Sequence, residues 1–193
     1  VNFGQSSNDV IPTAIHVSAA IFLEESLIPS IKHLITTIDE KASTLTEATK
    51  TGRTHLMDAM PVTLEQTIKT WGQQVQFALN QIKSVQKNIQ TLALGGTAVG
   101  TGINTHSDFA VRAVKELSRI SNIEFTNPES FFPLMSSQDI AVSLSGSLKT
   151  MAVSLMKVSN DLRWMNSGPL AGLGEITLEL SLIHISEPTR RRT

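Results

Sequence analysis

Long runs of apolar residues at intervals of three and four positions constrain the fold of this chain more than any other feature. This spacing gathers apolar side chains on one face of a helix. The positions are Ile28, Ile31, Ile35, Ile38, Ala42 and Leu45; Leu64, Ile68, Trp71, Val75, Leu79, Ile82, Val85, Ile89 and Leu92; and Ile140, Leu144, Leu148, Met151, Leu155, Val158, Leu162 and Met165. The pattern predicts an all-α fold built as a bundle of long helices.

The ends of these helices are marked by residues that cap or interrupt a helix. Asn8 or Asp9 is expected to cap the first helix, with Pro12 in its first turn, and Pro29 is expected to kink or restart it. The other expected boundaries are Thr63 before the second helix, Ser136 or Ser137 before the third, and Gly168 with Pro169 after it.

The third predicted helix is on the order of 40 Å long, since each helical residue adds about 1.5 Å. Such a helix is too long to bury its own apolar stripe within a small compact domain. The stripes therefore predict near-antiparallel packing against further helices, either in identical chains or in domains outside this sequence.

Composition and charge exclude several classes of protein. A net charge of −1 with no basic stripe argues against nucleic-acid binding. No apolar run approaches the ~20 residues that span a bilayer, so no membrane partner is expected. The absence of cysteine excludes disulfides and thiolate sites and is typical of a cytoplasmic or mitochondrial-matrix compartment.

The two ends of the sequence predict that the chain is an internal fragment. It begins at Val1 without a methionine, and residues 179–193, ELSLIHISEPTRRRT, follow none of the preceding patterns. This segment reads like a translated sequencing-library adapter. We therefore interpret residues 1–178 as a partial domain and residues 179–193 as a non-native tail, which excludes His184 as a candidate.

Three polar islands interrupt the apolar scaffold. The first, GQSSNDVIPTAIH, sets Ser6, Ser7 and Asn8 before a helix start, where they either cap the helix or donate hydrogen bonds to an anion. The second, TGRTHLMDAMPVT at residues 51–63, is interpreted as a polar loop. By itself its His55 is either a solvated side chain or a functional one, and Arg53 and Asp58 are expected to form an ion pair.

The third island, LALGGTAVGTGINTH, suggests a nucleotide site but lacks its essential features. It follows a helical pattern rather than a strand, has no GK[ST] ending, and carries Thr105 where a dinucleotide fingerprint requires glycine. Its glycines are instead expected to let the backbone turn sharply and approach a neighbour closely.

In this order, the islands resemble the fumarase/aspartase superfamily, and within it the class II fumarate hydratases. The resemblance covers residues 1–178 through QSSNDVIPTAIH, GRTHLMDAMPVTL, LALGGTAVGTGINTH and MKVSNDLRWMNSGPLAGLGEITL. Fumarases carry GRTH where aspartases carry GRTQ, so His55 favours the hydratase, as does Gly95-Gly96-Thr97 over the aspartase GAT.

The resemblance implies a fold and a reaction. The long-helix bundle would be the central domain of the superfamily fold, pooled by four chains into a homotetramer whose active sites each draw on three chains. The reaction would be reversible hydration of fumarate to L-malate, a step of the tricarboxylic acid cycle, with no cofactor and no metal.

The resemblance also assigns roles to individual residues. Ser6, Ser7 and Asn8 would bind the carboxylate of a small dicarboxylate substrate, and Thr54 would donate a further hydrogen bond. His55, with Thr54, would be catalytic and hold the water that adds to or leaves the substrate. Asn104 would bind substrate by shaping the site.

Several family elements are missing from the sequence. GEI is not followed by the loop GSSxMPxKxN that carries the family's carbon-acid base, and the upstream HPND segment and a downstream acidic partner of the histidine are also missing. Further departures are Glu65, Thr67, Ser145 and Leu170. We therefore expect the parent protein to be a fumarate hydratase and this chain alone to be inactive. The alternatives are an aspartate ammonia-lyase and a non-catalytic helical oligomerisation fragment.

Overall fold

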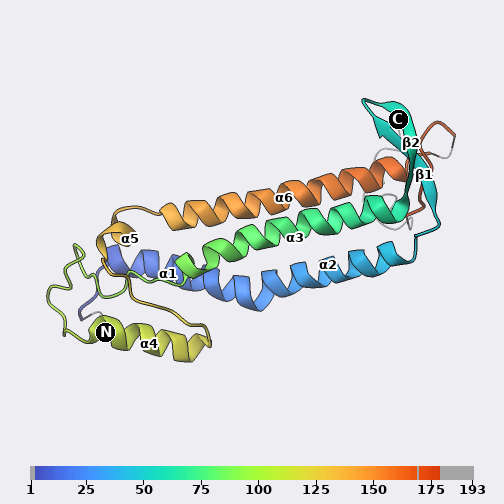
Figure 1. The fold of residues 1–193 in the computed structure, drawn as a ribbon. Coiled ribbons are helices and arrows are strands. Elements are labelled where there is room, and N and C mark those ends of the chain that lie inside the picture. The colour runs from blue at the N-terminus through green and yellow to red at the C-terminus, as the bar shows by residue number, and fades with distance from the viewer. Residues whose placement is uncertain (1–2, 169, 179–193) are drawn as a thin grey trace, which may run out of the picture.

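The computed structural model describes residues 3–168 and 170–178, and most of them are helical (Figure 1). Residues 1–2, Pro169 and residues 179–193 lie outside the described residues, and the last of these segments is the predicted tail. The elements in chain order are α1 (Ser7–Phe22), the π-helical turn η1 (Leu23–Leu27), α2 (Ile28–Ser43), β1 (Thr49–Thr54), β2 (Met57–Thr63), α3 (Leu64–Ile89), α4 (Phe109–Ser121), α5 (Phe132–Ser136) and α6 (Asp139–Met165).

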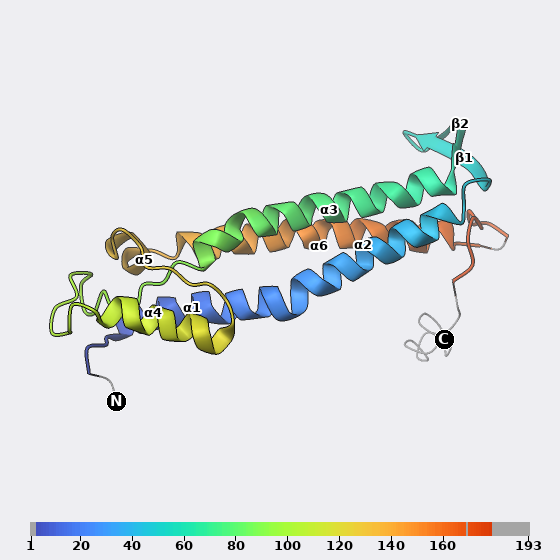
Figure 2. The same cartoon turned by 60° about the horizontal axis from the view of Figure 1, so that its bottom comes forward.

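Three long rods form the body of the structure (Figures 1 and 2). One rod is the continuous run of α1, η1 and α2, and the other two are α3 and α6, with α3 packed against both α2 and α6. The chain runs along α1 and α2 in one direction, returns along α3, and runs along α6 in the first direction again. The helix α3 is therefore antiparallel to both of its neighbours. The predicted bundle of long helices is confirmed.

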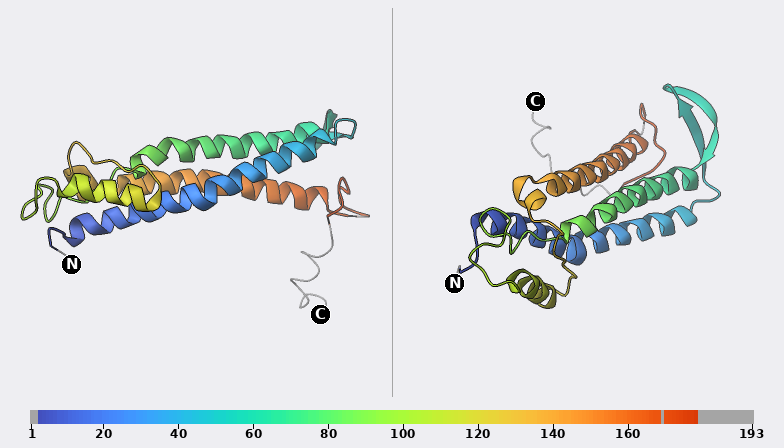
Figure 3. Two further views of the ribbon diagram at one scale, coloured as in Figure 1. Left: turned by 90° about the horizontal axis from the view of Figure 1, so that it is seen from below. Right: turned by 60° about the vertical axis from the view of Figure 1, so that its left-hand side comes forward.

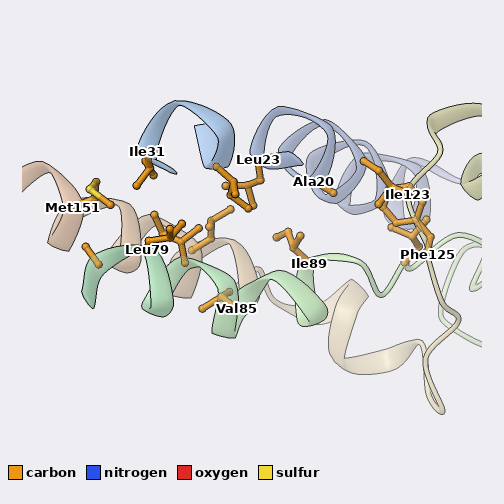
Figure 4. Close-up of a cluster of buried hydrophobic side chains, with 14 of the residues drawn as sticks. Ala20, Leu23, Ile31, Leu79, Val85, Ile89, Ile123, Phe125 and Met151 are labelled. Carbon is orange, nitrogen blue, oxygen red and sulfur yellow. The ribbon is translucent and has the colours of Figure 1, made fainter. Parts of the chain in front are cut away.

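The core follows the predicted apolar stripe of α3. Val75, Leu79, Ile82 and Ile89 are each at most 1% exposed, because α3 is the rod with neighbours on two sides. Figure 4 shows side chains from α1, α2, α6 and the segment after α4 gathered around this stripe. The side chains drawn from those elements and from η1 include Ala20, Leu23, Ile31, Ile123, Phe125 and Met151.

The first rod is bent where its hydrogen-bond ladder changes. In η1 the backbone N–H of Ile28 donates to Leu23 O, one residue further back than in an α-helix. Pro29 follows at once in the first turn of α2. Because proline has no N–H and its ring clashes with the carbonyl four residues back, a π-turn just before it accommodates the ring. The predicted interruption near Pro29 is confirmed.

The structure corrects two predicted helix starts and confirms a third. Ser6, rather than Asn8 or Asp9, caps α1: the Ser6 Oγ accepts the Asn8 N–H over 3.2 Å. The helix α6 starts after Gln138, one residue beyond the predicted serines. Thr63 caps α3 as predicted, in a capping box with Gln66.

Part of the apolar surface of the bundle stays uncovered within one chain. Leu148 and Leu155, in the predicted stripe of α6, are 37% and 38% exposed, and Trp164 on the same helix is 66% exposed. The neighbouring Phe77 of α3 is 59% exposed. The exposure of these apolar side chains agrees with the expectation that the long helices pack against further helices.

The first rod is also long and apolar enough to cross a membrane, by length and composition alone. This differs from the expectation that no apolar run is that long, because the structure joins two helical segments into one helix over Ser7–Ser43. Core helices of soluble proteins pass the same test. Here the buried side chains Leu23, Ile28 and Ile31 pack in the core shared with α3.

Candidate active site

The donor-rich turn at Ser6–Asn8 is fixed by the start of α1. Ser6 has an extended backbone, with φ −136° and ψ 156°, and its N–H donates to Asp9 Oδ1 over 2.9 Å, which completes a capping box. Asn8 Nδ2 donates to Ala98 O over 2.8 Å. Ser7 and Asn8 are exposed at the helix N-terminus, where N–H groups and the helix dipole favour an anion.

The glycine-rich island folds into a tightly turned loop beside this turn. Gly100 N and Gly102 N both donate to Gly96 O, over 2.9 and 3.2 Å. A Cβ on Gly95 would lie 2.3 Å from Ala110 Cβ, closer than side chains tolerate. The predicted sharp turning and close approach of the glycines are confirmed.

Asn104 lies at the far end of the same loop. Its φ of 64° is left-handed, which asparagine tolerates better than most residues. The next residue, Thr105, touches the chain just before the donor turn, because a Cβ on Gly4 would lie 2.5 Å from Thr105 Oγ1. The predicted substrate-binding residues Ser6, Ser7, Asn8 and Asn104 therefore come from two segments that meet at one end of the bundle.

The segment interpreted as a polar loop is a two-stranded antiparallel hairpin. Strand β1 pairs with β2 from Thr49 opposite Thr63 to Thr54 opposite Met57, with an irregularity around Gly52. Pro61 is paired within β2, opposite Thr51. Thr63 at the end of the strand then caps α3.

His55 and Leu56 form the tip of this hairpin. Their φ angles are 48° and 63°, and two consecutive left-handed residues are the geometry of a type I′ turn. Such turns prefer asparagine, aspartate and glycine, and neither His55 nor Leu56 is one of these residues. The backbone at the tip is therefore strained. His55 is exposed and Leu56 is 97% exposed. The fold thus presents the imidazole on the outermost point of a projecting ribbon.

A cleft of about 580 Å³ lies at the base of the hairpin. Thr54 lines it together with Arg53, Met60, Asp161 and Trp164, among others. One wall of the cleft is formed by the strands and another by the end of α6.

Glu175 closes this cleft with two ion pairs. Its carboxylate lies 2.8 Å from Lys50 Nζ and 2.7 Å from Arg53 Nη1, and its side chain is 10% exposed. Arg53 was expected to pair with Asp58, and that prediction is wrong. The two backbones face each other in the hairpin, but the guanidinium reaches across to Glu175, 122 residues away in the sequence.

The pKa of Glu175 is lowered although burial opposes its ionisation. Burial raises the pKa, and the hydrogen bonds from Lys50 and Arg53 outweigh it and lower the pKa below the usual glutamate range. A carboxyl with a lowered folded-state pKa stabilises the fold at neutral pH. That stabilisation is present above the unfolded-state pKa and is lost as the pH falls through the lowered folded-state pKa, where the carboxylate is protonated.

Replacing Glu175 by glutamine is therefore expected to lower the thermal unfolding midpoint at pH 7, with a loss of about 1 kcal/mol for a partly solvated ion pair. The difference between the variant and the parent chain is expected to shrink as the pH is lowered through the folded-state pKa of Glu175. Glu116→Gln, at the exposed pair with Arg119, is the control and should leave the midpoint unchanged. A shift of the midpoint in Glu175→Gln that did not change with pH would contradict the ion-pair account.

The two groups of predicted site residues lie at opposite ends of the bundle (Figure 3). The donor turn and the glycine-rich loop are at the end where α3 finishes, and the hairpin with Thr54 and His55 is at the end where α3 begins. Since α3 has 26 residues, they are separated by roughly 39 Å of helix. One chain cannot bring His55 to Ser6.

Two connections in this structure were not foreseen from the sequence. Asp9 links the donor turn to the glycine-rich loop, and Glu175 links the hairpin to the segment after α6. The spacing of Ser6 and Asp9 fits a capping box, but no local signal connects either acid to its distant partners.

Comparison with known proteins gives a consistent set of relatives. A family model described as Lyase matches residues 1–181. The chain is 58% identical over 179 residues to "Fumarate hydratase class II 2" of Pseudomonas aeruginosa, covering 93% of this chain and 39% of that protein. It is 51% identical over 178 residues to "Fumarate hydratase class II" of Xylella fastidiosa, covering 92% and 38%.

Among solved structures, the recombinant class II fumarase from Schistosoma mansoni is similar in fold, with a TM-score of 0.85 and 35% sequence identity. The similarity covers 89% of this chain and 39% of that one. The chain thus spans about two fifths of the length of the relatives it matches.

Proposed function

The chain belongs to the lyase family, and from this premise we propose that its parent protein is a class II fumarate hydratase, a hydro-lyase of the tricarboxylic acid cycle. The observation that carries the proposal is the GRTH element, with His55 at the hairpin tip, in a chain 58% identical to a protein named fumarate hydratase. We further propose that residues 1–178 are a partial lyase domain, mostly the central helical bundle, and that residues 179–193 are a non-native tail.

The residue types suit the addition of water to a dicarboxylate. Removing a proton from the carbon next to a carboxylate spreads a second negative charge onto that carboxylate, so the site needs fixed hydrogen-bond donors there. Ser6, Ser7 and Asn8 supply hydroxyl and amide donors at a helix N-terminus. Asn104, in the adjoining loop, shapes the same donor site.

His55 and Thr54 supply the second half of the chemistry. An imidazole exchanges protons near neutral pH, so His55 holds and activates the water that adds to the double bond, and returns a proton when malate loses water. Thr54 donates a hydrogen bond to the same substrate. Neither step needs a cofactor or a metal.

The separation of these two halves supports assembly from several chains. His55 and Ser6 lie at opposite ends of a helix of roughly 39 Å. A neighbouring chain packed antiparallel would bring its His55 to this chain's donor turn. We therefore propose a homotetramer with shared sites, acting on fumarate and malate in the cytoplasm or the mitochondrial matrix.

A chimera tests the proposed function. Residues 1–178 replace the matching segment of the Pseudomonas aeruginosa class II fumarate hydratase, and fumarate absorbance is followed with malate as substrate. We expect hydratase activity within about tenfold of the unmodified enzyme, and none from the 193-residue chain alone. Ammonia release from aspartate in place of hydration would identify an aspartate ammonia-lyase. A folded, tetrameric chimera with neither activity would leave only the helical oligomerisation role.

A further inference from the structure

The carboxylate of Asp9 is the most completely buried charged group in the described part of the chain, with 0% of the residue exposed. Such a group must be satisfied by hydrogen bonds, because burying a charge without partners is costly. Three backbone N–H groups meet it: Ser6 N donates to Oδ1 over 2.9 Å, and Gly95 N and Thr97 N donate to Oδ2 over 3.1 and 2.9 Å.

The two carboxylate oxygens serve different parts of the protein. Oδ1 closes the capping box at the start of α1, a local role that many helix starts show. Oδ2 instead binds the glycine-rich loop, whose two donors stand 86 and 88 residues further along the chain. A helix cap alone would not need this second connection.

The bound loop is strained at the residue that Oδ2 holds. Thr97 has φ 60°, a left-handed backbone that a β-branched residue rarely adopts, and it is 4% exposed. Its hydroxyl is buried and has no hydrogen-bond partner among the described residues. Strained residues persist only where their surroundings fix them. The hydrogen bond from Thr97 N to Asp9 is one such constraint, and the bond from Asn8 to Ala98 O is another.

We propose that Asp9 is a positioning residue for the substrate carboxylate. One rigid carboxylate fixes the donor turn Ser6–Asn8 on one side and the glycine-rich loop with Asn104 on the other, so that donors from both segments converge on the same anion. Asp9 itself does not touch the substrate. The inference rests on the proposed function for the identity of that substrate, and on the three hydrogen bonds to Asp9 for the connection between the two segments.

The substitution Asp9→Asn separates the two roles of the carboxylate. An asparagine keeps the shape, and its oxygen can still accept from Ser6 N as a helix cap. Its NH₂ group then faces the N–H groups of Gly95 and Thr97. All three groups are donors, so the hydrogen bonds to the glycine-rich loop are lost. Thr13→Val is the matched control: Thr13 is buried on the same helix and its hydroxyl donates to the Asp9 carbonyl, but it binds neither segment of the site.

In the tetrameric chimera we expect Asp9→Asn to lower kcat/KM by about 100-fold, the effect of a donor set displaced by about 1 Å. Much of the loss should appear as a raised KM for fumarate, because the displaced groups bind its carboxylate. Thr13→Val should stay within about threefold of the parent. Hydrogen exchange should accelerate at residues 94–98 in Asp9→Asn and stay slow in the control.

Three outcomes would overturn the inference: unchanged kcat/KM in Asp9→Asn, a loss confined to kcat, or a loss matched by Thr13→Val. If Asp9→Asn does not fold, Asp9→Glu replaces it; this variant keeps the charge and displaces it by one methylene, and the same losses are expected in smaller degree. If the unsubstituted chimera has no hydratase activity, the proposed function fails. Hydrogen exchange at residues 94–98 then tests by itself whether Asp9 holds the glycine-rich loop. Unchanged exchange in Asp9→Asn would overturn that connection.

Discussion

Replacing His55 by asparagine in the chimera is expected to lower kcat for malate dehydration by about 10²- to 10⁴-fold, the usual contribution of a general acid–base. Asparagine is the informative substitution because His55 has φ 48°, and asparagine tolerates this left-handed backbone better than most residues. The hairpin should therefore form as well as before, or better, so that the loss reports on the imidazole.

Two further variants separate chemistry from hairpin geometry. His55→Gln should lose as much activity as His55→Asn, although glutamine is less suited to a left-handed turn. Leu56→Asn keeps His55, eases the same strained tip and should retain most of the activity. If His55→Asn kept more than a tenth of the parent kcat, His55 would not be the residue that handles water, and the Thr54-His55 assignment would fail.

The long helices could be predicted because their signal is repeated along the whole segment. In α3 and the residues just after it, the stripe from Ile68 to Leu92 is buried at every predicted position, and no single residue decides the outcome. Helix starts were less certain, because a start depends on one hydrogen bond. At α1 both Ser6 and Asp9 can cap, and only the geometry shows that the Ser6 Oγ accepts from the helix while Asp9 bonds back to Ser6 N.

The hairpin was not predicted because its turn has the wrong residues for its geometry. Two-residue type I′ turns are recognised by Asn-Gly or Asp-Gly, and His55-Leu56 gives no such signal. Gly52 and Pro61 weaken the strand pattern further. In the structure a Cβ on Gly52 would lie 2.4 Å from Met60 O, so the glycine permits the close approach of the two strands. The residues that hid the hairpin from sequence analysis are those of its two-residue tip and of its irregular strand pairing.

The long-range connections lay beyond sequence reasoning for a different reason. Asp58 is five residues from Arg53 and was the obvious partner, whereas Glu175 becomes its neighbour only when α6 returns beside the hairpin. Asp9 and Gly95 likewise meet only because α3 carries the glycine-rich loop back to the start of α1. Such pairs are properties of the antiparallel bundle, and the bundle had to be known before either could be named.

Gly95→Ala is expected to disrupt the loop that Asp9 binds. The new Cβ would lie 2.3 Å from Ala110 Cβ and 2.9 Å from Ala110 Cα, and the backbone has φ 107°. Overpacking costs about 1–3 kcal/mol, and a side chain at such a φ costs about 1–3 kcal/mol more. The chimera should thus lose about 2–6 kcal/mol of stability in this region and nearly all activity, measured by thermal unfolding and malate dehydration.

Gly146→Ala is the control that makes this result specific to backbone geometry. Gly146 lies inside α6, and a Cβ there would meet nothing within 4 Å in the described part of the single chain. Alanine should stabilise the helix by about 0.5–1 kcal/mol. A Gly95→Ala chimera as stable and active as the parent would mean that α4 can move away from the loop. The close contact of Gly95 with Ala110 would then not be what holds the glycine-rich loop against Asp9.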